Sequence, residues 1–284
     1  MMLTMRQFAS TESITDLLSR LEIISCSKGF QNTVIRAILD DEAVFVKIYG
    51  EPENFDNESL VLLQLEKDNF VFPRLRAHHR NLLANILSCV PGRPLTKDDC
   101  DNGAFDQFVV SLRSLHGFRG LHKRNGIQRE MIDLYVRKIC ESIHVKEEEK
   151  KLVSEVAGSV REILLKIPYK SFVHGDLNAS NILYCHESQK IGYIDFERAR
   201  VDHPFADLAK FSWRVLDNES DIVRMLLVKY LQRKPDKKEV TLLNAYMALE
   251  FLGAVSYYAY EGHANNYPYK DQAIHNLALW PLLK

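Results

Sequence analysis

The sequence FVHGDLNASNILYCHESQKIGYIDFE, residues 172–197, decides how this chain folds and what chemistry it can carry. Residues 182–185 and 190–193 are two short apolar runs separated by four polar residues, a pattern that predicts a β-hairpin. Pairing of these strands would bring Asn181, just before the first, beside Asp195, just after the second. We therefore expect an amide oxygen and a carboxylate to meet at one mouth of the hairpin.

Asn181 and Asp195 offer hard oxygen ligands, which suit Mg²⁺ because this ion takes few protein ligands and keeps water and phosphate in its shell. Asp176 lies in the loop that leads into the hairpin, from where it can reach a substrate hydroxyl without binding the metal. Phosphoryl transfer needs this combination of a metal and a carboxylate that orients the hydroxyl. Each residue alone is more often a turn or strand-end residue. The occurrence of Asp176, Asn181 and Asp195 together favours a phosphoryl-transfer site over three unrelated turn residues.

Composition narrows the class of protein. The chain has 284 residues, of which 46% are hydrophobic and 26% charged, as expected for a folded globule. The formal net charge is −1 and the sequence pI is about 6.8. A nucleic-acid or anionic-membrane partner usually requires a basic excess, so we expect neither. Nothing in the sequence indicates an obligate protein partner.

Sequence features also bear on the compartment. The first residues, MMLTMRQFAS, lack the basic start and apolar run of a signal peptide. The most apolar late segment is interrupted by Glu250 and does not reach the roughly 20 apolar residues of a membrane span. The five cysteines form no CxxC pair, which is typical of reduced thiols, so we expect a cytoplasmic protein.

The periodicity changes along the chain. In its first part it predicts a helix over 13–22, strands over 33–39 and 43–49, a helix over 58–67, and strands near 71–76 and 82–88. Beyond the breaker PGRP it predicts helices over 104–116, 128–144, 147–166, 219–232 and 239–261. We expect residues 1–90 to form a nucleotide-binding lobe, an antiparallel sheet with a helix. Residues 91–284 would form a helical lobe with the catalytic loop and acceptor site, and a small-molecule site is expected in the cleft between lobes.

The strings HGDLNASN and IDFE resemble the catalytic and metal-binding motifs of the aminoglycoside phosphotransferase and choline kinase superfamily. This family has the two-lobed α+β fold of protein kinases. The resemblance implies that Asp176 is the catalytic base and that Asn181 and Asp195 bind Mg²⁺. It also implies that the phosphoryl donor is ATP.

The resemblance extends over about residues 23–215. Lys47 in VFVKIY looks like the lysine that binds the α- and β-phosphates, and Glu58 like its ion-pair partner. VPGRPL resembles the interlobe linker, and Asp207 in FADLA resembles a structural aspartate. Each has a simpler alternative: Lys47 as an edge-strand residue, Glu58 as a first-turn acid, and Asp207 as a helix cap. His174 is expected to be a packed core histidine.

Two departures from the kinase pattern matter. No G-x-G-x-x-G is present, and only residues 27–32, with Gly29, lie between the first two strands, so its backbone amides are the candidates for holding phosphate. Glu197 replaces the glycine of the protein-kinase metal motif, which fits the small-molecule branch. Backbone groups of the linker, at Ser88 and Val90, are expected to contact adenine.

The acceptor is not decided by the sequence. From Asp217 onward, eight acidic residues stand against eight basic ones, so this part does not favour a polycation such as an aminoglycoside. A tyrosine cluster could form an aromatic wall for a quaternary ammonium or a heteroaromatic ring, or simply pack a helix. Its members are Tyr257, Tyr258, Tyr260, Tyr267 and Tyr269.

The sequence therefore predicts an ATP-dependent phosphotransferase that acts on a hydroxyl of a small molecule, similar to aminoglycoside phosphotransferases. The alternative is a metabolic kinase for choline, ethanolamine, thiamine or a sugar. A non-catalytic nucleotide-binding regulator would be expected to have lost one of Lys47, Asp176, Asn181 and Asp195, all of which are present. A metal-dependent phosphohydrolase would need more converging carboxylates and histidines than these motifs supply.

Overall fold

The computed structural model describes residues 19–29, 31–65, 71–120, 128–168, 171–261 and 269–283. The chain forms two compact units. Of the described residues, the sheet unit holds those up to Pro94, Gly120 and Asn181–Ala199, and the helical unit holds the others. The division is discontinuous along the chain, because the segment Asn181–Ala199 belongs with the N-terminal sheet. The assignment of functions to lobes 1–90 and 91–284 stays a prediction.

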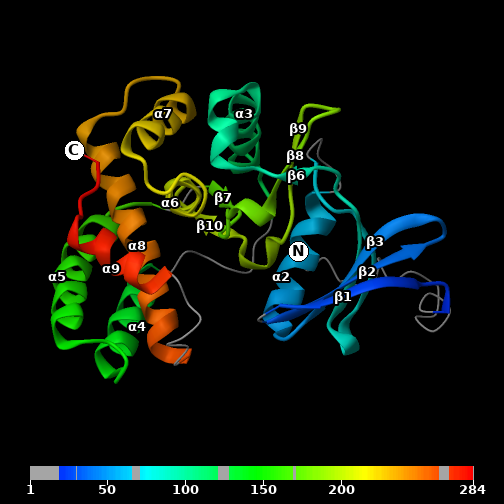
Figure 1. The fold of residues 1–284 in the computed structure, drawn as a ribbon, viewed down its shortest axis with the longest axis horizontal. Helices are drawn as coiled ribbons and strands as arrows, with labels where there is room; N and C mark the ends of the chain where they lie inside the picture. The colour runs from blue at the N-terminus through cyan, green and yellow to red at the C-terminus, as the bar shows by residue number, and fades with distance from the viewer. Residues whose placement is uncertain are drawn as a thin grey trace. The chain divides into compact units, whose positions relative to one another are not determined.

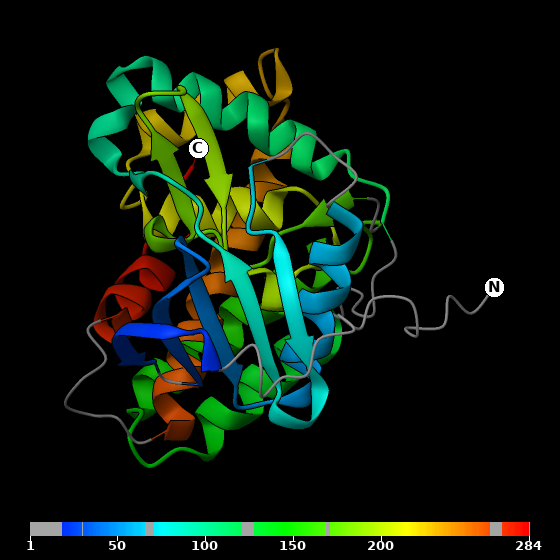
Figure 2. The same ribbon diagram turned by 90° about the vertical axis from the view of Figure 1, so that its right-hand side faces the viewer.

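The sheet unit is built on an antiparallel sheet with the strand order β1-β2-β3-β5-β4 (Figure 2). Its elements are β1 (Glu22–Lys28), β2 (Asn32–Leu39), β3 (Glu42–Tyr49), α2 (Pro52–Leu65), β4 (Leu75–His79), η2 (Arg80–Leu82) and β5 (Ala84–Ser88). The β2–β3 turn is tight because Asp40 and Asp41 both adopt positive φ, 51° and 64°, as a two-residue hairpin turn requires. Buried Ala37, Val44 and Ile86 form the sheet's core.

The predicted hairpin over 182–185 and 190–193 is confirmed. β8 (Ile182–Cys185) pairs with β9 (Lys190–Tyr193), and Ile182 lies opposite Tyr193. β6 (Arg93–Pro94) adds a short third strand, and η4 (Ala179–Asn181) and η5 (Phe196–Arg198) flank the hairpin. A Cβ on Gly192 would lie 2.5 Å from a methyl carbon of Val90, so only glycine lets the Val90 side chain pack this closely against β9.

The helical unit is organised around α8 (Figure 1). Its elements are η3 (Lys97–Asp101), α3 (Gly103–His116), α4 (Gln128–Glu141), α5 (Glu147–Leu164), β7 (Ser171–Val173), β10 (Arg200–Asp202), α6 (Phe205–Arg214), α7 (Ser220–Leu231), α8 (Lys237–Glu261) and α9 (Tyr269–Ala278). α8 packs against α4, α5, α6 and α9. It is long and apolar enough to cross a membrane, but 72% of the window Lys237–Ala259 is buried inside the protein, as expected of a core helix.

Several predicted elements are wrong in their bounds or missing. The strand expected at 71–76 lies at Leu75–His79, while Val71 makes only an isolated bridge to Gly192. The helix expected to end at Glu22 cannot do so, because β1 begins there; most of that helix lies outside the described residues. The pattern did not predict α6, α9, β6, β7 or β10. α6 is amphipathic but has only ten residues, fewer than the roughly 11–18 over which a helical period is read, and β6, β7 and β10 have three residues or fewer.

Candidate active site

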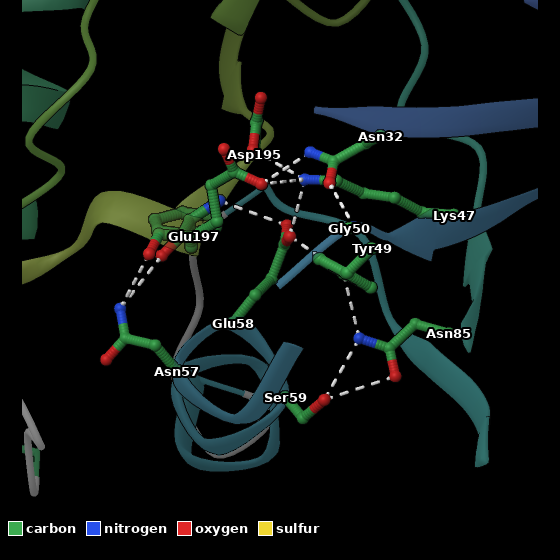
Figure 3. A network of polar contacts seen from close by, with 11 residues as sticks. Asn32, Lys47, Tyr49, Gly50, Asn57, Glu58, Ser59, Asn85, Asp195 and Glu197 are labelled. Carbon is green, nitrogen blue, oxygen red and sulfur yellow. Dashed lines mark hydrogen bonds and ion pairs between the residues drawn. The ribbon is translucent and has the colours of Figure 1, made fainter. Parts of the chain in front are cut away.

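Lys47 lies at the centre of a buried polar network in the sheet unit (Figure 3). Its Nζ is 2.7 Å from Oε2 of Glu58, 2.6 Å from Oδ1 of Asp195 and 3.2 Å from Oε2 of Glu197. Glu58 projects from α2, and Asp195 and Glu197 follow the hairpin. The sequence prediction that Lys47 pairs with Glu58 is confirmed at the level of geometry, and Lys47 is an interior residue rather than an exposed edge residue.

Burial alone would lower the pKa of Lys47, but the carboxylates of Glu58, Asp195 and Glu197 raise it above its usual value. Lys47 is therefore held as an ammonium ion. The pKa of Glu58 is raised, because burial outweighs the opposing effect of Lys47. Its oxygens nevertheless act as acceptors, from Lys47, from the Tyr49 hydroxyl at 2.8 Å and from the backbone N–H of Phe196 at 3.0 Å. These donors favour the carboxylate form.

The network has more negative than positive charge. One ammonium and three carboxylates leave a formal surplus of two negative charges, and the three carboxylates each place an oxygen within 4.8 Å of the others. Oxygen atoms of this kind are the preferred ligands of a divalent hard cation. Asp195 is the most accessible member, with 32% of its side chain exposed against 8% for Glu197.

The segment that carries Asp195 is fixed by its own unusual backbone and by α2. Asp195 adopts a left-handed conformation, φ 68° and ψ 66°, which turns the chain sharply after β9. The side-chain amide of Asn57 donates to the carbonyls of Ala199 at 2.8 Å and Glu197 at 3.1 Å. Asn57 thus ties α2 to the turn that presents both carboxylates.

Asn181 lies where the hairpin argument expected it. Its carbonyl accepts the N–H of Ile194 at 3.1 Å, so Asn181 stands directly across from the residue before Asp195. The side chain of Asn181 is buried. Asn181 and Asp195 therefore share one mouth of the hairpin, as predicted from the spacing.

A further layer of hydrogen bonds holds Lys47 and Glu58 from behind. The amide of Asn85 on β5 donates to the Tyr49 hydroxyl at 2.9 Å and pairs with the Ser59 hydroxyl at 3.1 Å. Tyr49 in turn donates to Glu58. On the other side, the Asn32 amide donates to Glu197 at 2.6 Å (Figure 3).

The remaining nucleotide candidates have mixed surroundings. The N–H of Gly29 donates to the carbonyl of Asn32 at 2.8 Å, which closes the turn after β1. The N–H of Ser88 donates to the carbonyl of Arg74 at 2.9 Å, so this group is already used within the sheet unit. Val90 is buried against Gly192.

In the helical unit, Asp207 organises the loop that carries Asp176. Its carboxylate accepts the backbone N–H groups of His174 at 2.7 Å and Gly175 at 2.8 Å, and lies 3.1 Å from Nε2 of His116. Burial would raise the pKa of Asp207, but these hydrogen bonds and the nearby histidines lower it overall. Asp207 is thus a loop anchor rather than a helix cap, and His174 is fully buried, as expected.

Asp176 itself is partly buried in this loop and lies near the ammonium of Lys210. Nζ of Lys210, on α6, lies 3.5 Å from Oδ1 of Asp176 and 3.0 Å from Oε2 of Glu250 on α8. Lys210 therefore bridges two carboxylates that are far apart in the sequence. A charged bridge of this kind fixes the orientation of a carboxylate.

Residues 22–243 match a family model described as the phosphotransferase enzyme family. This chain belongs to the phosphotransferase enzyme family. The predicted resemblance to the aminoglycoside phosphotransferase and choline kinase superfamily is confirmed. Among curated proteins, none matches the chain in sequence.

Solved structures of this phosphotransferase fold show the same kinase-like architecture at low sequence identity. Choline kinase LicA from Streptococcus pneumoniae is 17% identical with a TM-score of 0.74, over 94% of this chain and 97% of that one. The GDP and kanamycin complex of APH(2")-IIia is 15% identical with a TM-score of 0.71, over 94% and 96% of the two chains. Macrolide 2'-phosphotransferase type I is 16% identical with a TM-score of 0.66, over 93% and 95%.

Some residues of this phosphotransferase were not singled out from the sequence. Asn57, Asn85 and Lys210 carry no motif, and their roles depend on contacts across 26 to 142 positions or on helix packing. Glu250 did give a signal, since it interrupts an otherwise apolar stretch of α8. A lone acid in such a stretch indicates a partner in the interior.

The tyrosine cluster is partly accounted for by packing. Tyr258 is buried beneath the ammonium of Lys270, 5.1 Å from its ring centroid. The ring of Tyr269 lies 3.6 Å from the guanidinium carbon of Arg214. A cation of the protein itself therefore lies over the ring of each of these two tyrosines, which favours packing over an aromatic wall for a ligand. Tyr260 and Tyr267 lie outside the described side chains.

Proposed function

We propose that this chain transfers the γ-phosphoryl group of ATP, with Mg²⁺, to a hydroxyl group of a small molecule. The observation that carries the proposal is the Lys47 network. Family membership supports the reaction class, and the AMP and GDP complexes of similar structures support the donor class. A buried ammonium held charged among three carboxylates combines a phosphate-binding cation with ligands for a divalent metal.

In this proposal the residues of the sheet unit hold the nucleotide. Lys47, positioned by Glu58, binds phosphate oxygens, and Gly29, Ser88 and Val90 are candidates for backbone contacts. The surplus negative charge and the hard oxygens of Asp195 and Asn181 fit Mg²⁺, which would neutralise charge on the phosphates when bound.

Asp176 is proposed as the catalytic base. Nζ of Lys210 lies 3.5 Å from its Oδ1, and this charge helps to fix the orientation of the carboxylate. The position of this loop is fixed, because the carboxylate of Asp207 accepts the backbone N–H groups of His174 and Gly175, the two residues before Asp176. Asp176 would accept the proton as the hydroxyl oxygen attacks phosphorus.

Two acceptor classes follow from the relatives. The similarity to the kanamycin complex of APH(2")-IIia supports an aminoglycoside as the first candidate. The similarity to choline kinase LicA supports a metabolic alcohol, with choline, ethanolamine, thiamine or a sugar as candidates. A cytoplasmic location is proposed with either class, and the five cysteines are free thiols. Neither nucleic acid nor membrane is part of the proposal.

The proposal is tested by ADP release from MgATP in the presence of pooled acceptors. We expect acceptor-dependent release by the wild-type chain and its loss in Lys47→Ala. Lys151→Ala removes an exposed lysine on α5 and serves as the matched control. If Lys47→Ala keeps nucleotide affinity and turnover, Lys47 is only a strand residue and the proposal fails.

A further inference from the structure

The surroundings of Asp176 continue along one face of α6. Lys210, which contacts Asp176 and Glu250, and Arg214 are four residues apart, so their side chains lie on the same face about one helical turn from each other. Trp213 lies three residues after Lys210 and packs edge-on against Phe251 of α8, the residue next to Glu250. Arg214 therefore lies in the same part of the helical unit as the proposed base.

Arg214 is held in a stacked position. Its guanidinium carbon is 3.6 Å from the ring centroid of Tyr269 and 5.3 Å from that of Trp213, and the two rings meet edge-on at 6.1 Å. Stacking fixes the plane of the guanidinium and leaves its N–H groups to point outward from the edge. A guanidinium fixed in this way can bind a carboxylate or phosphate through two parallel hydrogen bonds.

The acceptor for these N–H groups is missing from the described part of the chain. There Arg214 contacts the two rings but pairs with no carboxylate, whereas Arg161 and Arg233 pair with Asp133 and Glu239. The guanidinium N–H groups are donors, so the group that would complete the hydrogen bonds of Arg214 is an acceptor, and beside a cation it is an anion.

We propose that the acceptor molecule of this phosphotransferase carries a carboxylate or phosphate in addition to its hydroxyl, and that Arg214 binds this anionic group. The inference rests on the proposed function, and it favours hydroxy acids or sugar phosphates over the aminoglycoside and choline-like acceptors named there. Lys210 is already paired with Asp176 and Glu250, but no described carboxylate offsets the charge of Arg214, so Arg214 would disfavour a cationic group beside it. The hydroxyl oxygen of the acceptor attacks the γ-phosphorus of ATP and forms an O–P bond, while its proton passes to Asp176. The bond between the γ-phosphorus and the bridging oxygen breaks, and ADP leaves with its electron pair.

The test compares matched acceptors in the ADP-release assay with full-length protein. Glycerol, glycerate and glycerol 3-phosphate form one series, and glucose, gluconate and glucose 6-phosphate another, with choline and kanamycin as cationic probes. Calorimetry measures the binding of the same compounds. Arg214→Gln keeps a planar end group for stacking but removes the charge, and Arg233→Gln removes the same charge from an ion pair elsewhere.

We expect an anionic compound of each series to give a higher kcat/KM than the neutral one. Comparison of the carboxylate with the phosphate compound shows which anion Arg214 binds. Arg214→Gln should raise KM for that compound about 10- to 100-fold with little change in kcat, and leave the neutral member and the melting temperature unaffected. Arg233→Gln should change neither. Preference for choline or kanamycin, an equal effect on neutral and anionic members, or no binding of any anionic member overturns the inference. If the wild-type chain does not bind MgATP at all, the proposed function itself is contradicted.

Discussion

Lys47 in the sheet unit and Asp207 in the helical unit are both enclosed charges, but their surroundings differ in balance. Lys47 meets three carboxylates, so its network retains a surplus of negative charge. Asp207 meets two backbone N–H groups and His116, so its carboxylate is well supplied with donors. A network with a surplus favours a further cation, whereas a satisfied network only fixes a conformation. The first is therefore suited to binding and the second to anchoring.

Replacing Asp195 by Ala gives the largest expected effect and tests the surplus directly. We expect loss of Mg²⁺-dependent ATP binding and turnover, with the melting temperature unchanged or raised, because like charges are removed from the network. Nucleotide titration with and without Mg²⁺ and thermal unfolding measure both results. Asp271→Ala, at a largely exposed site, is the control. Near-normal turnover of the Asp195 variant would disprove the metal assignment.

Asp176→Asn, in the helical unit, should impair turnover without impairing nucleotide binding, in contrast to Asp195→Ala. The change keeps the shape of the side chain but removes the proton acceptor, so kcat should fall by about 10²- to 10⁴-fold. MgATP affinity should stay close to the wild-type value, since Asp176 is proposed to touch the acceptor. A variant that loses nucleotide binding instead would make Asp176 a metal ligand.

Asp207→Ala should act on stability. It leaves the buried N–H groups of His174 and Gly175 without their acceptor, at a cost of about 3–5 kcal/mol in the free energy of unfolding. Urea unfolding measures this loss. Asp106→Ala breaks only an exposed pair with Lys229 and should change stability by less than about 1 kcal/mol. Equal losses in the two variants would contradict the anchoring role.

The lowered pKa of Asp207 gives the same comparison a pH dependence. Because its folded pKa lies below the unfolded value, near 3.9, its contribution is complete above that value and is lost as the pH falls through the folded pKa. Unfolding curves of the wild type and Asp207→Ala should therefore converge in strong acid.

His203 gives the smallest expected effect and extends the comparison to a half-buried neutral base. Burial lowers the pKa of His203 to about 4, and its Nδ1 accepts the N–H of Phe205 at 3.2 Å. Since the unfolded pKa is about 6.5, stability is complete above that value and decreases by about 3 kcal/mol as the pH falls towards 4. His203→Gln should flatten unfolding free energies over this interval. An unchanged slope would contradict the assignment.

The sequence could predict those parts of the site that are local. The hairpin and its flanking Asn181 and Asp195 lie within 15 residues, and alternation with a polar turn determines the pairing. Lys47 and Glu58 were found because family motifs mark them. Their interior environment was not predictable, because it depends on the approach of residues 195–197 from 148 positions away.

Lys210, Glu250 and Arg214 show where local patterns fail. Each is a charged residue on a helix, and the common explanation for such a residue is a solvated face. Only the packing of α6 against α8 and α9 brings Lys210 to Glu250 and Arg214 to Tyr269. α6 itself was missed because its amphipathic pattern covers only ten residues, fewer than the roughly 11–18 over which a helical period is read.

The central position of α8 has a consequence for biosynthesis. α4 and α5 emerge from the ribosome about a hundred residues before α8, yet both pack against it. The N-terminal sheet likewise waits for Asn181–Ala199. During synthesis, the apolar faces of α4 and α5 that pack against α8 therefore stay exposed to solvent until residue 261 has been added. In this interval the nascent chain exposes apolar surface to which a chaperone can bind.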